Sequence, residues 1–255
     1  MTTVNIKDYP QIAYPKRNKY IDYIVDFCYF RKLKIQRNRF KKKNNSLAPG
    51  ILDGLDEFYA KSDSSKADYL QRLAEIISIL EQHKPTNIAE MGSGRSSLVF
   101  AAWAKKQGIG YTAFEQSDHW LQLANAITSC ITEKTHVIKQ EIVEIPNFGG
   151  RYKNDIDPNC DFIYVDGPTI LVKNNQTTHT RKSCYTDTAD FLRRGGQPKV
   201  IVVEGRTDSV DLIIAEAKRL NLDFEFKPGY RWAIQRGQYL RSIALRHHSV
   251  IIFKW

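Results

Sequence analysis

Three carboxylates end short apolar runs and are well placed to do chemistry: Glu115, Asp166 and Glu204. In an open parallel sheet, an acid at the carboxyl end of a strand faces the ligand crevice. There it can accept hydrogen bonds from ribose hydroxyls or take a proton from a reacting hydroxyl. The alternative is a structural role, because such acids also cap helices.

A glycine-containing turn lies upstream of these acids, within the stretch NIAEMGSGRSS from Asn87 to Ser97. The apolar run at 88–91 predicts a strand, and the amphipathic segment at 96–106 predicts a helix. Glycines in such a turn let a ligand approach the backbone, and the free N–H groups at the helix start favour electron-rich groups. The turn is therefore a candidate site for phosphate, ribose or carboxylate.

Two common nucleotide motifs fit this turn poorly. A phosphate-binding P-loop needs Gly-Lys-Ser/Thr, whereas this chain has Gly94-Arg95-Ser96. A dinucleotide fingerprint needs a third glycine where Ser97 stands. Glu115 follows the glycines by about 20 residues, the spacing at which an acid meets ribose hydroxyls in nucleotide-binding α/β units. That acid suits several nucleoside ligands, and a purely structural turn is the remaining alternative.

The pattern Glu90-x-Gly92-x-Gly94 resembles motif I, Asp/Glu-x-Gly-x-Gly, of class I S-adenosylmethionine-dependent methyltransferases. With Glu115 and Tyr164-Val-Asp166-Gly-Pro, the resemblance covers residues 65–255. It implies S-adenosylmethionine as cofactor, with its methionine part on the glycines, its ribose on Glu115 and its adenine near Gln140 or Glu141. The cofactor contacts implied are Glu90, Gly92, Ser93, Gly94, Ser96, Glu115, Gln116, Gln140 and Asp166.

The catalytic candidates follow from the proton that a hydroxyl acceptor must lose: Asp166, Glu204 and His179. Holding the acceptor and the methyl group in line can contribute roughly 7 to 11 kcal/mol, so little else is required of the protein. Asp166 and Glu204 could supply oxygen ligands to a divalent ion. The metal-dependent members carry Asp-Asn where this chain has Glu204-Gly205, so no metal is expected.

Strands and helices alternate along the chain in the order of an α/β protein. We expect a doubly wound, seven-stranded, mostly parallel sheet with a C-terminal antiparallel strand, and a basic helical arm at the N-terminus. The resemblance implies that the last strand inserts between the fourth and the fifth. The composition predicts loops at 146–159 and 170–182, the second lying over the crevice.

The basic charge is concentrated at the N-terminus. Residues 1–50 hold twelve Lys/Arg against three Asp, which leaves +9 of the +10 formal charge there. A helix is predicted from Tyr20 to Phe40, followed by a linker at 43–50, so we expect an arm at 1–50 and a methyltransferase-like domain at 51–255. Residues 16–43 favour an anionic membrane surface slightly over nucleic acid, and packing on the protein's own body is the alternative.

The chain of 255 residues has no 18-residue apolar run and no signal-peptide layout. Its four cysteines are scattered along the sequence. These features predict a cytoplasmic protein with free thiols. Peripheral attachment to a membrane through the basic arm is the alternative location. The segment 230–247 carries Tyr230, Arg231, Trp232, Arg236, Arg241, Arg246 and His247.

Arginine with aromatic residues suits an anionic or sugar-containing acceptor, either a small molecule or a glycan, with O-methylation favoured. Two alternatives stay open. One is a methyltransferase-like protein that binds a nucleotide or glycan without catalysis, and the other is an RNA-binding methyltransferase that uses the basic arm.

Overall fold

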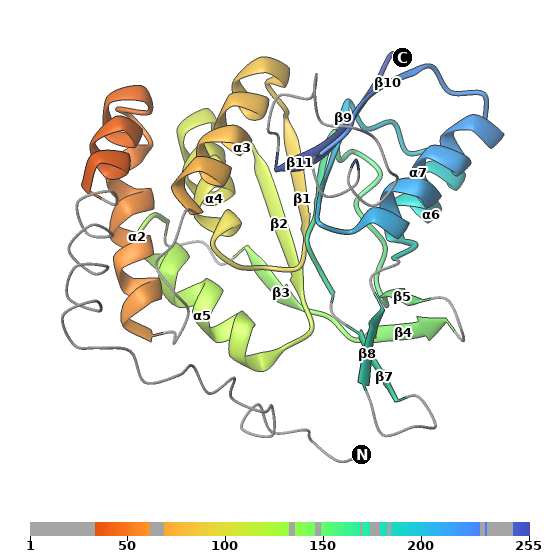
Figure 1. Ribbon diagram of the computed structural model, residues 1–255, viewed down its shortest axis with the longest axis horizontal. Coiled ribbons are helices and arrows are strands. Elements are labelled where there is room, and N and C mark those ends of the chain that lie inside the picture. The colour runs from red at the N-terminus through yellow and green to blue at the C-terminus, as the bar shows by residue number, and fades with distance from the viewer. Residues whose placement is uncertain are drawn as a thin grey trace.

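The computed structural model describes residues 34–61, 69–132, 136–145, 149–168, 170–173, 179–182, 185–229, 233 and 247–255. Its centre is a seven-stranded sheet in the order β10-β11-β9-β6-β1-β2-β3 (Figure 1). Strand β11 runs antiparallel to both of its neighbours, which confirms the predicted mostly parallel sheet with a C-terminal antiparallel strand. The strands are β1 (Asn87–Met91), β2 (Gly110–Glu115), β3 (Val137–Lys139), β6 (Phe162–Val165), β9 (Val200–Glu204), β10 (Phe224–Lys227) and β11 (His248–Phe253).

Helices cover both faces of the sheet, as a doubly wound fold requires (Figure 1). On one side lie α2 (Ala48–Lys61), α3 (Tyr69–His83), α4 (Ser96–Gln107) and α5 (Asp118–Ser129), and on the other α6 (Asp187–Arg193) and α7 (Thr207–Arg219). Helix α5 is capped by Ser117, whose hydroxyl accepts from the Trp120 N–H at 3.4 Å. The two faces enclose two apolar clusters, which fix the strand ends that carry the acids.

The position of the last strand differs from the expectation. Strand β11 lies between β9 and β10, the fifth and sixth strands of the sheet, and not between the fourth and fifth. The fourth and fifth strands, β6 and β9, already pair directly in parallel, with Val165 opposite Val203. No edge is left between them, so β11 adds to the other side of β9, with Val250 opposite Val202.

Both predicted loops contain strands. Strands β4 (Ile142–Ile145) and β5 (Gly149–Tyr152) form one antiparallel hairpin, and β7 (Ile170–Lys173) and β8 (His179–Lys182) form another. Two-stranded hairpins outside the main sheet bury little apolar surface, so their sequences lack the alternation that reveals a strand. Tyr152 is the exception, because it is fully buried at the end of β5.

The predicted linker at 43–50 is wrong, and the expected boundary at residue 50 falls inside α2. Residues 34–43 are helical, and the Asn44 N–H caps that helix by donating to the Phe40 carbonyl at 2.9 Å. Phe40, Leu47 and Ala48 are buried in the same cluster as α4 and α5. Part of the basic segment thus packs on the body, while residues 20–33 of the predicted arm helix lie outside the described residues.

Among the described residues, no helix has both the length and the apolar character needed to cross a membrane. Cys130 and Cys160, the two cysteines within those ranges, are free thiols. Burial raises the pKa of the Cys160 thiol to about 12.

Candidate functional site

The glycine turn joins β1 to α4 and is in direct backbone contact with the end of β6. Gly92 has a φ of +88°, and a Cβ placed on it would lie 2.4 Å from the Gly167 Cα atom. The Gly167 N–H donates to the Met91 carbonyl at 2.5 Å, which holds the two turns together. Gly94 is different, because a Cβ there would meet no described atom within 4 Å. The first glycine is needed for packing, and the second leaves open space.

Glu90 lies beneath this turn and is fully buried. Its carboxylate accepts hydrogen bonds from the hydroxyls of Ser96 at 2.5 Å, Tyr111 at 2.6 Å and Ser97 at 2.7 Å. Burial raises the pKa of Glu90 to about 8, although these hydroxyls act in the opposite direction. Glu90 and Ser96, both predicted cofactor contacts, thus use their side chains to brace the first turn of α4.

Glu115 ends β2 and closes the glycine turn from the other side. Its Oε2 accepts from the Ser93 N–H at 2.9 Å and the Ser93 hydroxyl at 3.0 Å, while Oε1 accepts from the Ser117 N–H at 2.8 Å. The side chain is 5% exposed. The structure therefore brings together Gly92, Ser93 and Glu115, three of the predicted cofactor contacts. Hydrogen bonds from Ser93 and Ser117 already fill part of the accepting capacity of the Glu115 carboxylate.

Gln116 and Gln140, the other two predicted nucleoside contacts, lie next to Glu115 at the carboxyl ends of β2 and β3. Gln116 is partly exposed next to Glu115. Gln140 is buried, and its N–H donates to the Glu115 carbonyl at 2.8 Å. The side chain of Gln140 also lines a cavity of about 290 Å³ on the open face of β1, β2 and β3, with Thr112 and Phe114.

Asp166 follows β6 and is held by Arg206, which follows β9. The Arg206 guanidinium donates to the Asp166 carbonyl oxygen and lies 3.7 Å from the Asp166 Oδ1 atom. The Asp166 side chain is 40% exposed, whereas that of Arg206 is 4% exposed. Asp166 therefore lies partly exposed beside Gly167, and its predicted role as a cofactor contact and catalytic group stays a prediction.

Glu204, expected to face the crevice, is turned instead toward α3. It is 8% exposed and accepts from the Arg72 guanidinium and the Tyr164 hydroxyl. The His248 Nε2 atom lies 3.6 Å from Glu204, and its Nδ1 atom lies 3.3 Å from Glu75. The buried His248 imidazole thus lies between the carboxylates of Glu204 and Glu75. Strand β11 places it there, because His248 is opposite Glu204 in the pairing of β11 with β9.

The charges in this cluster stabilise one another. Burial alone would lower the pKa of His248, but its interactions with Glu204 and Glu75 outweigh burial and raise the pKa to about 9. Burial likewise opposes ionisation of Glu204, yet His248, Tyr164 and Arg72 hold the pKa of Glu204 at about 2. The group is an ion cluster that joins α3, β9 and β11, and Glu204 is committed to it.

Some predicted residues cannot be placed. His179 begins β8, but its side chain lies outside the described residues, as do residues 230–232 and 234–246 of the arginine-rich segment. Within the parts of the chain that the structure describes, no group of three or more His, Cys, Asp or Glu side chains is arranged to hold a metal ion.

Sequence reasoning missed four residues near the site: Tyr152, Asp187, Arg206 and His248. Arg206 follows the predicted strand and its acid by two positions, which is the one local signal available. The partners of the others are far away in sequence, such as Asp187, which accepts from the Tyr152 N–H at 2.8 Å. Spacing alone cannot reveal contacts of that kind.

Comparisons with known proteins find likeness in structure only. No protein-family profile and no curated protein sequence matches the chain. A methyltransferase from Podospora anserina bound to S-adenosylhomocysteine is similar at 14% identity, 95% and 98% coverage of the two chains and a TM-score of 0.49. An O-methyltransferase from Bacillus cereus in complex with S-adenosylhomocysteine is similar at 10% identity, 81% and 90% coverage and a TM-score of 0.44. Identities this low do not fix the chemistry, which depends on the site residues themselves.

Proposed function

We propose that the chain is an S-adenosylmethionine-dependent methyltransferase that methylates a hydroxyl group of an anionic or sugar-containing small-molecule or glycan acceptor. The observation that supports it most is the turn in which Gly92 packs on Gly167, Gly94 stays open and Glu115 closes the side. This turn lies at the carboxyl ends of β1, β2 and β6, where ligands bind in open α/β sheets.

The donors and acceptors present fit a nucleoside with an amino-acid tail. Open space at Gly94 admits the tail against the backbone. A carboxylate has about four accepting positions, and three of those on Glu115 are filled by Ser93 and Ser117. One ribose hydroxyl can therefore bind directly, and a second requires the Ser93 hydroxyl to turn away.

The methyl donor, a co-substrate, supplies a carbon bound to a positively charged sulfur. What this chain supplies is position: the rigid contact between Gly92 and Gly167 fixes the donor side, and Asp166 lies at the rim where the acceptor enters. Glu90 is too deeply buried to touch either reactant. Glu204 is engaged by Arg72, Tyr164 and His248, so we assign it no part in the proton transfer.

S-adenosylhomocysteine will raise the melting temperature of the protein, and Gly94→Val will abolish that rise. At a concentration 100 times Kd, binding stabilises the folded state by about 2.7 kcal/mol, which corresponds to roughly 5 to 10 °C for a chain of this size. The valine occupies the space in which the ligand lies. Differential scanning fluorimetry with and without the ligand measures the shift.

The same variant contains its own control. Because a Cβ at residue 94 would meet no described atom within 4 Å, we expect the ligand-free melting temperature of Gly94→Val to stay close to that of the wild type. If NAD stabilises the wild type and S-adenosylhomocysteine does not, the proposed function is wrong. An unchanged shift in the valine variant would place the ligand elsewhere.

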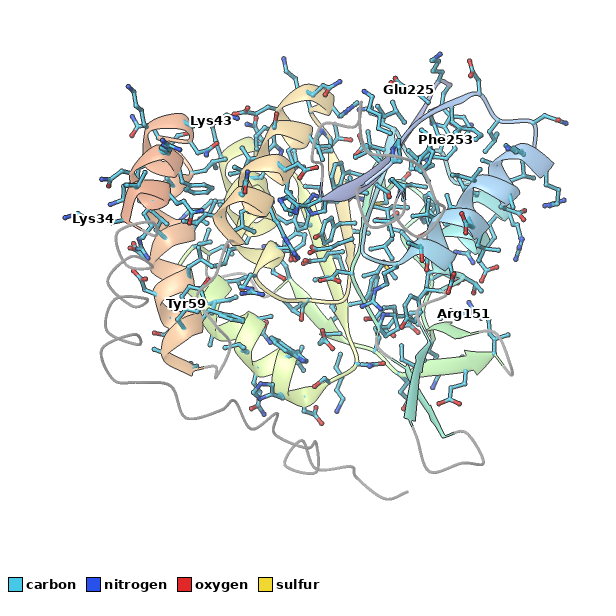
Figure 2. All side chains as sticks on the ribbon, in the orientation of Figure 1. Lys34, Lys43, Tyr59, Arg151, Glu225 and Phe253 are labelled. Carbon is cyan, nitrogen blue, oxygen red and sulfur yellow. The ribbon has the colours of Figure 1, made fainter. Side chains whose placement is uncertain are left out.

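We also propose that the exposed basic residues of the segment 34–43 bind an anionic membrane surface. Arg37 is paired with Asp56 at 2.6 Å, but Lys34, Arg39, Lys41, Lys42 and Lys43 are exposed without an ion pair among the described residues. Lys34 and Lys43 lie on the outer side of the molecule, away from the sheet (Figure 2). A groove of about 240 Å³ is lined by the cationic side chains of Arg39 and Lys43 together with the apolar residues Phe40 and Leu70.

Replacing Lys41, Lys42 and Lys43 together with glutamine will weaken binding to vesicles that contain phosphatidylserine by roughly 100-fold, at about 1 kcal/mol per lysine. Substitution is preferable to deletion of the segment, because Phe40 belongs to the core. Sedimentation of the protein with the vesicles measures the binding.

The matched control replaces three exposed lysines on other elements, Lys153, Lys218 and Lys254. That triple variant should bind the vesicles nearly as well as the wild type at 0.15 M salt. Equal losses in both triple variants would show that only net charge matters, and the membrane proposal would then fail.

A further inference from the structure

The groove beside the basic segment lies between the helix at residues 34–43 and the start of α3. One wall is formed by positions i, i+3, i+4 and i+7 of the first helix, which lie on a single face of it: Gln36, Arg39, Phe40 and Lys43. Asn44 follows that helix, and the other wall consists of Leu70, Gln71 and Ala74 on α3. The groove is accessible from solvent, because Arg39, Lys43 and Gln71 are exposed.

The floor of the groove is apolar and is anchored to the body of the protein. Phe40 is 4% exposed and Leu70 is 7% exposed, and both belong to the apolar cluster on that side of the sheet. Ala74 packs against the same cluster. Helix α3 is also fixed by Arg72, whose guanidinium donates to Glu204 at the end of β9. Because both walls are held in place by the core, a ligand that enters the groove does not have to order them.

The rim of the groove is cationic. Arg39 and Lys43 are one helical turn apart, and neither makes an ion pair among the described residues. Arg37, on another face of the same helix, is paired with Asp56 at 2.6 Å, so the absence of an acid is particular to the groove side. Like charges four residues apart on a helix repel one another. An anion bound between Arg39 and Lys43 would remove that repulsion.

The apolar floor and the cationic rim together define the class of ligand. A phosphate monoester carries a charge of about −1.5 to −2 at pH 7, which matches two cations better than the single charge of a carboxylate. The guanidinium of Arg39 can hold two phosphate oxygens, and the Lys43 ammonium adds a point charge. An alkyl chain on the phosphate would continue onto Phe40 and Leu70. A nucleotide would leave this apolar floor unused, and a neutral lipid would leave the cations unpaired.

We propose that the groove binds one molecule of a single-chain lipid with a phosphate monoester head, with the phosphate on Arg39 and Lys43 and the chain on Phe40, Leu70 and Ala74. This inference goes beyond the membrane surface proposed above, which depends on the summed charge of several exposed cations. The groove instead recognises one molecule by its head and its tail. Nothing in the inference depends on methyl transfer.

The test is isothermal titration calorimetry of the full chain with octyl, decyl and dodecyl phosphate, each below its critical micelle concentration. The expected result is one molecule bound per chain. Each added CH₂ group will tighten binding by up to about fourfold, equivalent to roughly 0.8 kcal/mol, until the groove is full. Dodecanoate, which has the same tail length but a single charge, will bind roughly tenfold less tightly than dodecyl phosphate.

Two variants separate the head from the tail. Arg39→Gln removes an exposed cation, so the protein will fold normally and all three alkyl phosphates will bind roughly tenfold less tightly, with the dependence on chain length unchanged. Ala74→Leu adds side-chain volume to the groove wall, so it will reduce the gain in affinity from octyl to dodecyl phosphate. Circular dichroism confirms that each variant is folded.

The matched control is Lys41→Gln, because Lys41 is an exposed cation of the same helix that does not line the groove. Its affinity for dodecyl phosphate will stay within about twofold of the wild type, since an exposed charge outside the groove is screened by salt. An equal loss in Lys41→Gln and Arg39→Gln would show that only net charge matters, and the groove assignment would be overturned.

The inference is also overturned if dodecyl phosphate does not bind, or if it binds no more tightly than octyl phosphate. A second copy of the chain in the groove would appear in light scattering as a dimer that dodecyl phosphate does not dissociate, and this result would equally exclude the lipid. Binding of vesicles and of S-adenosylhomocysteine is measured separately. Either of those proposals can therefore stand when the alkyl phosphates fail to bind.

Discussion

His248→Gln will lower the free energy of unfolding by about 3 to 5 kcal/mol at pH 6, the range observed when one member of a buried ion pair is removed. His248 is 0% exposed and lies within 3.6 Å of Glu204 and 3.3 Å of Glu75. The substitution leaves two buried carboxylates with less opposing charge. Urea unfolding monitored by circular dichroism measures the change.

The loss will depend on pH in a defined direction. The folded-state pKa of His248, about 9, exceeds its ordinary value of 6.5, so its contribution is complete below pH 6.5 and disappears as the pH rises through about 9. The difference between wild type and variant will therefore shrink between pH 6.5 and 9. Glu90 titrates in both proteins and cancels from that difference.

His119→Gln is the matched control, because His119 is exposed on α5 and far in sequence from this cluster. Its effect will be within about 0.5 kcal/mol, as for most surface substitutions. A loss for His248→Gln that is equally small, or constant from pH 6 to 9, would show that the imidazole carries no charge in the folded protein.

Gly92→Ala will destabilise the protein by about 2 to 5 kcal/mol and eliminate the thermal shift with S-adenosylhomocysteine. Overpacking against Gly167 accounts for about 1 to 3 kcal/mol and the left-handed backbone for about 1 to 2. The new Cβ would lie 2.4 Å from the Gly167 Cα atom, and backbone atoms cannot rotate away. Chemical unfolding and fluorimetry measure the two effects.

Gly94→Ala makes the same substitution two residues further on, at a position with open space. We expect a change within about 0.5 kcal/mol there. Similar losses at residues 92 and 94 would contradict the asymmetry between the two glycines, and with it the role of the Gly92–Gly167 contact as the rigid side of the site.

The central strands were predictable from the sequence because burial on both faces leaves a continuous apolar run. Strands β2 (GYTAFE) and β9 (VIVVE) are runs of this kind, and each ends in one of the three acids noted in the sequence. The order of the strands was harder to predict, because the apolar sequence of β11 does not show which neighbouring strand it will pair with. That choice depends on the direct pairing of β6 with β9.

The linker error has a local cause. Asn, Ser, Pro and Gly at 44–50 are typical of a turn, but Pro49 falls in the first turn of α2, where a missing N–H costs nothing. Leu47 and Ala48 are buried beside it. Composition registered the turn at residues 44–47 and missed the helix that starts immediately after it.

At the site, the sequence revealed residue types but not what they bond. The spacing of Glu90 from the glycines was sufficient to mark the turn, yet its three hydroxyl partners make it a brace. In the sequence, Glu204 and Asp166 look equivalent because both end apolar strands. The fold distinguishes them, because it places His248 beside Glu204 and Arg206 beside Asp166. Long-range pairs of this kind arise from the sheet order.

The packing of residues 40–58 has a consequence for the solubility of shortened forms of the protein. Gly54 on α2 approaches the Leu98 side chain of α4 so closely that a Cβ there would lie 2.2 Å from it. A chain that starts at residue 51 keeps this contact but loses Phe40, Leu47 and Ala48 from the same cluster. The apolar surface exposed in this way promotes self-association. Residues 40–48 therefore help to keep the α/β body soluble, because they cover that surface.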